Sequence, residues 1–204
     1  MKKIIIAVVG ALVAVGAGVG LWFFLDSSAV AATVGSTKIT ISQVDGTIKQ
    51  VLAERATVST TGMQLASGGS LNAQQLNFYI ISTLLDQTLA ANNLSVTDAQ
   101  VKVRAAAILK QEGTAAKLKS GEVSAGIASS VFPGYVREIL SVEALTKLVE
   151  SKGTAVANSG TEVQALVRAQ ANKVGVKIKD TKKYGKWDAT QVTVVPPSTT
   201  TTTK

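Results

Sequence analysis

The sequence contains neither histidine nor cysteine among its 204 residues. A chain without these residues cannot form a Ser-His-Asp or Cys-His catalytic site, an ordinary zinc site, a redox-active cysteine pair or haem ligation by either side chain. Any remaining catalysis would have to use carboxylates, lysines or a serine-lysine pair. No SxxK-type arrangement stands out, so we expect no enzyme activity, no cofactor and no metal.

Aromatic residues are also scarce, at 4% of the chain, although hydrophobic residues make up 46%. The interior must therefore consist mainly of alanine, valine, leucine and isoleucine, a composition that favours helices with small and medium side chains. The length suffices for one domain with a real core.

Charged side chains are absent from residues 4–25, which follow Lys2 and Lys3. As a helix, these 22 residues would be about 33 Å long, enough to cross a hydrocarbon core of roughly 30 Å. By the positive-inside rule, the two lysines place the N-terminus in the cytoplasm and the rest of the chain outside.

This segment is either a cleaved signal peptide or a single-span anchor. Ala29-Val30-Ala31 supplies a small-x-small cleavage site, but the apolar run is longer than the roughly 7 to 15 residues of an ordinary signal peptide core. The aromatic residues at positions 22–24 lie where an interfacial aromatic belt would be. We favour an anchor in the cell membrane, with the C-terminal domain outside the cytoplasm; cleavage would make the protein periplasmic or secreted.

The predicted domain boundaries follow from this segment and from the C-terminus. Residues 1–32 are expected to form the signal peptide or anchor, and residues 33–195 one domain. Residues 196–204 combine two prolines with a run of threonines, which predicts a disordered tail.

Positive charge dominates the exported part. Residues 33–204 hold 19 basic and 12 acidic side chains, a net charge of +7. Outside the cytoplasm, this charge favours anionic lipid headgroups, wall polymers or acidic polypeptides over nucleic acid. The densest basic run is Lys173, Lys177, Lys179, Lys182, Lys183 and Lys186. Lysines near a strand edge commonly prevent aggregation, and an electrostatic partner site is the alternative interpretation.

Hydrophobic periodicity predicts strand, a run of helices, then strand. Residues 33–40 are rich in β-branched side chains and predict a short strand or tight hairpin, and Val174, Val176 and Ile178 alternate as in a strand. Between them, helices are expected over residues 42–56, 71–93, 98–112, 114–130, 133–149 and 161–173. Residues 57–70 are rich in serine, threonine and glycine, which predicts a long mobile loop.

Local signals mark several helix starts. Ser42 and Asn72 are expected as N-caps, Thr97 to Gln100 forms a capping box, and Pro133 occupies a first-turn position. Because isolated strands are unstable, the two terminal strands should pair and close a mainly helical domain with a small β element.

Three stretches resemble the SurA N-terminal domain family, the chaperone module of SurA-type and PrsA-type bacterial folding factors. Residues 33–44 (TVGSTKITISQV) resemble its opening strand, turn and first helix. Residues 76–101 (LNFYIISTLLDQTLAANNLSVTDAQV) resemble its next helix and capping box. Residues 176–188 (VKIKDTKKYGKWD) resemble the closing strand and the Tyr-Gly-x-Trp ending of stand-alone forms.

The resemblance implies a chaperone that holds unfolded or newly exported polypeptides in an apolar cradle between helices. Family members often carry a parvulin prolyl-isomerase domain, but this chain has no room for one and lacks the histidines of such a site. The alternative is a structural or assembly subunit of a cell-envelope complex that docks one specific partner; a surface-anchored binding protein for anionic polymers also stays open, on the basis of the net charge.

Four aromatic side chains are possible client contacts. Phe132 and Tyr135 flank a helix entry that looks exposed and are the better candidates. Tyr184 and Trp187 near the closing strand could form a client-facing patch, but such residues more often lock a strand onto helices.

Overall fold

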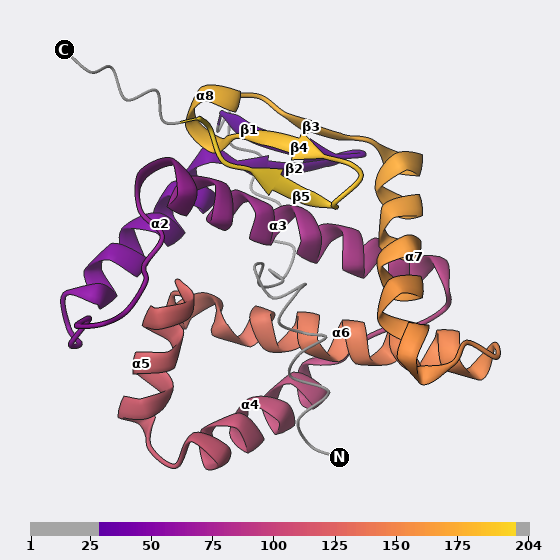
Figure 1. The fold of residues 1–204 in the computed structure, drawn as a ribbon, viewed down its shortest axis with the longest axis horizontal. Coiled ribbons are helices and arrows are strands. Elements are labelled where there is room, and N and C mark those ends of the chain that lie inside the picture. The colour runs from indigo at the N-terminus through magenta and orange to yellow at the C-terminus, as the bar shows by residue number, and fades with distance from the viewer. Residues whose placement is uncertain (1–28, 199–204) are drawn as a thin grey trace.

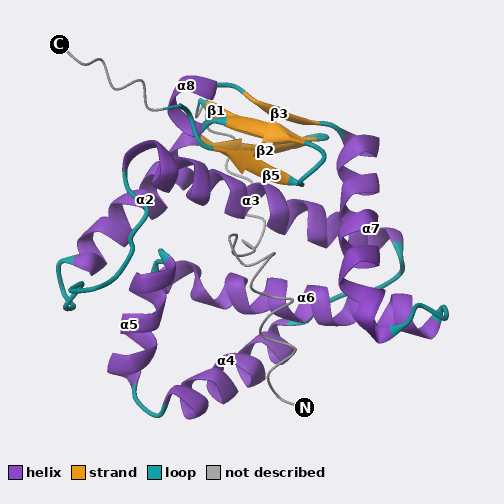
Figure 2. Cartoon of the chain, viewed as in Figure 1, coloured by secondary structure: helices purple, strands orange, loops and turns teal. Residues whose placement is uncertain are grey.

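The computed structural model describes residues 29–198 as a mainly helical protein with two small sheets (Figures 1 and 2). This agrees with the predicted fold class. The predicted anchor and residues 199–204 lie outside the described part of the chain. In chain order, the elements are β1 (Val30–Val34), β2 (Thr37–Thr40), α2 (Ile41–Arg55), α3 (Gly68–Ala91), α4 (Asp98–Glu112), α5 (Ala115–Ala125), η1 (Ser129–Val131), α6 (Phe132–Ser151), η2 (Val156–Asn158), α7 (Ser159–Val174), β3 (Val176–Ile178), α8 (Thr181–Tyr184), β4 (Lys186–Asp188) and β5 (Thr193–Val195).

The predicted pairing of the two terminal strands is confirmed. The larger sheet has the order β2-β1-β3, and β1 lies antiparallel to both neighbours. Thr33 faces Lys38 on one side and Lys177 on the other. Because side chains alternate along a strand, Ala32 and Val34 point to the opposite face, where they are fully buried.

Helix α3 is the centre of the molecule. Its residues from Gln75 to Ser82 are all buried, because the sheets cover one side of the helix while α2, α6 and α7 pack against others (Figure 1). A helix that is buried all round must lie inside the protein. Its core partners include Leu145 on α6 and Val163 on α7.

The helices form a frame in which α2, α3, α7, α6, α4 and α5 follow one another (Figure 1). The side formed by α3, α6 and α7 is mainly apolar. Helix α4 contributes only Val101 to the buried residues. It is held on α6 by ion pairs of Arg104 with Glu143 and of Arg137 with Asp98.

Several helix boundaries were predicted well, and two N-caps were wrong. The capping box from Thr97 to Gln100 is present. The first helix is capped by Thr40 in a capping box with Gln43, so the predicted cap at Ser42 lies inside the helix. Both Thr40 and Ser42 are good cap residues, and the strand that ends at Thr40 fixes the extended backbone that a cap requires.

Helix α3 also begins earlier than expected. Its N-cap is Ser67 and not Asn72, whose side chain instead donates to the carbonyl oxygen of Lys183 at 3.2 Å. The preceding loop is tied down, since the Arg55 guanidinium donates to the carbonyl oxygen of Ala66 at 2.7 Å. Residues 196–198 follow the last strand, and the Pro197 ring lies close to Gly69 at the start of α3.

A second hairpin, formed by β4 and β5, was not predicted. Its strands pair antiparallel with Trp187 opposite Val194. Asn77 on α3 accepts a hydrogen bond from the Val194 N–H at 2.7 Å, which fixes the hairpin against the central helix.

The fold starts before the predicted boundary at Thr33. Strand β1 begins at Val30, and Ala31 is fully buried. Backbone bonds reach further still, because the carbonyl oxygen of Ala29 accepts from the Ile41 N–H at 2.8 Å. Among residues 29–198, no helix is both long enough and apolar enough to cross a membrane.

Candidate functional site

The predicted client contacts Phe132 and Tyr135 lie in the first turn of α6, where α6 follows the short helix η1. Both side chains are half-buried. Tyr135 packs against the main core, and its burial, reinforced by the negative charge of Glu138, raises the pKa of its hydroxyl to about 12. Tyr135 is therefore neutral at physiological pH.

A polar cluster lies one turn further along α6. Glu138 is buried between α6 and α3, where the Ser82 hydroxyl donates to its carboxylate at 2.5 Å. Burial raises the pKa of Glu138 well above its usual value, and the nearby carboxylate of Asp86 pushes in the same direction. Burial also raises the pKa of Asp86, although the positive charge of Arg137 opposes this. The interior side of α6 is thus apolar at its start, and one turn further along it carries the buried carboxyl group of Glu138, which lies near Ser82 and Asp86 of α3.

The structure separates Tyr184 from the other predicted contacts. Its ring is fully buried, and its hydroxyl donates to the Asp45 carboxylate at 2.8 Å, beside Lys183, which pairs with the same carboxylate at 2.7 Å. Burial alone would raise the pKa of Asp45, but the hydrogen bonds from Lys183 and Tyr184 outweigh burial and lower it. Tyr184 therefore joins α8 to the start of α2 and has no exposed surface to offer a client.

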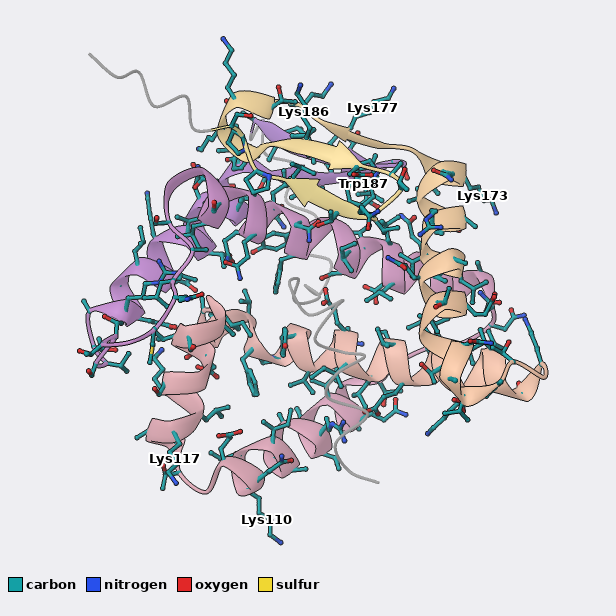
Figure 3. The ribbon with its side chains drawn as sticks, in the orientation of Figure 1. Lys110, Lys117, Lys173, Lys177, Lys186 and Trp187 are labelled. Carbon is teal, nitrogen blue, oxygen red and sulfur yellow. The ribbon has the colours of Figure 1, made fainter. Side chains whose placement is uncertain are left out.

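Trp187 lies in β4 and packs against the main core, while part of its surface stays exposed (Figure 3). Strand β4 belongs to the sheet side of α3, whereas Phe132 and Tyr135 start α6 on the other side of that helix (Figure 1). The structure thus brings the pair on α6 together and places Tyr184 and Trp187 elsewhere, where they fasten the closing segment to the helices.

A cavity of about 340 Å³ lies near the N-terminal half of α3. Its lining mixes polar side chains, among them Gln64, Ser70, Gln74, Asn77 and Thr193, with apolar residues such as Ala66, Ala73, Val194 and Pro196. The Gln74 amide nitrogen donates to the carbonyl oxygen of Ala125 at 2.8 Å. Its buried amide oxygen has no hydrogen-bond partner within residues 29–198.

Polar contacts close the frame between α2 and the α5–η1 turn. The Glu54 carboxylate pairs with Lys119 at 2.8 Å and accepts the Ser129 N–H at 3.1 Å. The Ser130 hydroxyl bonds to Gln50. Beneath them lies only a small apolar cluster of Val51, Leu71 and Ala128. Sequence periodicity gave no sign of this closure, because its partners are about 75 residues apart.

No group of three or more acidic side chains that could hold a metal ion occurs within residues 29–198. Together, these elements define a helical module that is closed by paired terminal strands. Residues 1–118, more than half of the chain, match the family model described as SurA-like N-terminal domain. The chain therefore belongs to this family of chaperone-related modules. Comparisons with curated proteins and with solved structures gave no match.

Proposed function

We propose that this protein is a membrane-anchored, extracytoplasmic holdase-type chaperone that binds unfolded or newly exported polypeptides. The observation that carries the proposal is the family match over residues 1–118. SurA-like domains bind unfolded polypeptides in general. A chain without histidine or cysteine has few means of acting on another polypeptide except by binding it.

The start of α6 supports an apolar binding surface. Phe132 and Tyr135 are neutral, half-buried rings near the polar closure of the frame. Aromatic side chains supply a large apolar contact area and, in tyrosine, a hydrogen-bonding end. Such groups bind many sequences because apolar contact is non-directional.

The position of β1 supports retention of the anchor. Cleavage after Ala31, at the only site that the sequence suggested, would remove Val30 and Ala31 from the central strand of the sheet. The carbonyl oxygen of Ala31 accepts from the Lys179 N–H at 2.8 Å, and that of Ala29 from Ile41. Cleavage would remove these hydrogen bonds and also the fully buried residue Ala31. The fold of the module therefore favours an uncleaved chain.

Aggregation assays test the chaperone function. The full chain should suppress the aggregation of denatured citrate synthase without accelerating prolyl isomerisation in a peptide assay. The variant Phe132→Ser/Tyr135→Ser should bind unfolded chains at least about tenfold more weakly, since two aromatic contacts are lost. Its helical circular dichroism should be retained. The matched control Val156→Ser, at an apolar residue that is 75% exposed in η2, should bind as the parent does.

Salt separates this function from polyanion binding. Apolar client binding should weaken only modestly at about 0.5 M salt, because screening acts on charges and not on apolar contact. If the chain has no affinity for several unrelated unfolded proteins but holds one envelope protein tightly, the chaperone proposal fails. The protein would then be the assembly subunit described above.

A further inference from the structure

Five exposed lysines lie together on the sheet side of the molecule, and the chaperone function does not use them. They are Lys38, Lys177, Lys179, Lys182 and Lys186, called here the basic sheet face. Lys38 and Lys177 flank Thr33 in register, so both point away from the buried face of the sheet. In Figure 3, Lys177 and Lys186 project from the sheets on the side away from α3.

Nearby acidic groups compensate only part of the positive charge of this face. None of the ion pairs among residues 29–198 includes any of the five lysines. Asp45 pairs with Lys183, which is not part of the face. Asp180 uses its carboxylate to accept the backbone N–H groups of Lys182 and Lys183. Asp180 and, in β4, Asp188 reduce the positive charge, but five lysines against these two carboxylates leave the face net positive, and such a patch attracts anionic partners.

The chain itself brings this face close to a membrane. The predicted anchor ends at Leu25 and β1 begins at Val30, so four residues join them. Fully extended, four residues reach at most about 14 Å. Lys179 bonds through its backbone to Ala31, at the start of β1. At physiological salt, electrostatic attraction extends over about 8 Å. The short connection to the anchor therefore lets the basic sheet face come within this range of the lipid headgroups.

We propose that the basic sheet face docks on the anionic phospholipid surface of the membrane that holds the anchor. This inference rests on the anchored form of the proposed function. A single hydrophobic anchor joined to several nearby lysines gives two attachments to one bilayer, and each lysine adds electrostatic attraction to anionic lipid. Docking would turn the sheets towards the membrane and leave α4, α5 and α6 facing away from it, where exported chains are free to reach them (Figure 1).

Spin labels on the full chain in lipid nanodiscs test the docking. The chain has no cysteine, so Lys177→Cys and Lys110→Cys each give one labelling site, on the basic sheet face and on α4 (Figure 3). Discs contain either phosphatidylcholine alone or phosphatidylcholine with about a quarter of phosphatidylglycerol. The readout is the collision rate of the label with a water-soluble nickel complex.

We expect the collision rate at position 177 to fall at least about threefold in anionic discs relative to neutral discs, while position 110 stays unchanged. The protection should disappear at about 0.5 M salt. It should also disappear in a background with Lys38→Gln, Lys179→Gln, Lys182→Gln and Lys186→Gln. That variant should still suppress aggregation, because α6 is untouched.

Equal collision rates at position 177 in both discs would overturn the docking while the anchor stands. A second result would also overturn the docking: anionic lipid gives no protection at position 177, but poly-glutamate added to neutral discs does. The partner of the face would then be an acidic polypeptide. Loss of aggregation suppression in the four-lysine variant would assign the lysines to client binding instead. A chain that does not enter the discs at all would remove the anchor, and the docking with it.

Discussion

At the scale of single residues, the buried carboxyl group of Glu138 is the most unusual feature. Placing an ionised carboxylate inside a protein is costly, so the folded state favours its protonated form. The native state then binds a proton that the unfolded chain releases. Stability is therefore greatest below the ordinary pKa of glutamate and falls as the pH rises through that value towards the raised folded-state pKa.

We predict that Glu138→Gln raises the melting temperature at pH 8, because the amide has a similar shape and carries no charge to desolvate. The gain over the parent should shrink as the pH falls to about 4, where the parent carboxyl group is protonated in both states. Calorimetry across this pH range measures the effect. Glu112→Gln, at an exposed residue of α4, is the control and should leave the pH profile unchanged. A parent profile that is flat between pH 4 and pH 8 would contradict the prediction.

At the scale of elements, the central position of β1 makes both chain ends of the module depend on one strand. Strand β3 is only three residues long and lies at the edge of its sheet. Its bonds to β1 include Lys179 N–H to Ala31 and, beyond the strand end, Gly35 N–H to Gly175.

We predict that Lys177→Pro loosens this pairing. Proline removes a backbone donor and fits poorly into a strand ladder. Hydrogen exchange at Gly35 and Lys179 should become at least about tenfold faster, which corresponds to a loss of about 1.4 kcal/mol in local stability. Lys38→Pro on the other edge strand is the matched control: Lys38 lies opposite Thr33, whose backbone bonds to β3, so the Lys38 N–H faces away from β1 and exchange at Gly35 and Lys179 should stay as in the parent. Unchanged exchange at Lys179 in the first variant would argue against the pairing.

At the scale of the whole molecule, the frame is closed unequally on its two sides. The contacts of α3, α6 and α7 bury leucines and valines, whereas the contact between α2 and the α5–η1 turn depends on Glu54 and a small apolar cluster. A partly exposed ion pair contributes at most about 1 kcal/mol. The polar side should therefore open first.

We predict that Glu54→Gln lowers global stability by less than about 1 kcal/mol but accelerates hydrogen exchange selectively in residues 115–131. The neutral amide keeps the size of the side chain and weakens its bonds to Lys119 and Ser129. Glu162→Gln, at an exposed residue in the first turn of α7, should leave exchange in residues 115–131 unchanged. Equal acceleration across α3 and α7 would mean that the frame unfolds as one unit.

The sequence alone determined the features that depend on neighbouring residues. The capping box at Thr97, the proline at the start of α6, most helix spans and the closing strand near Val176 arise from local hydrogen bonding and side-chain periodicity, which do not require knowledge of the rest of the fold. The resemblance of residues 76–101 identified the family for the same reason, since that stretch contains a helix, its end and the next cap.

Tertiary structure decided what depends on distant partners. The β4–β5 hairpin is too short to show a periodic pattern, and it is held in place by Asn77, which lies 117 residues before its partner Val194. Tyr184 is buried, and its hydroxyl bonds to Asp45, 139 residues before it; Thr40 replaces Ser42 as a cap because a strand ends there. The basic sheet face also needed the fold, because strand register is what brings Lys38 and Lys177 to the same surface.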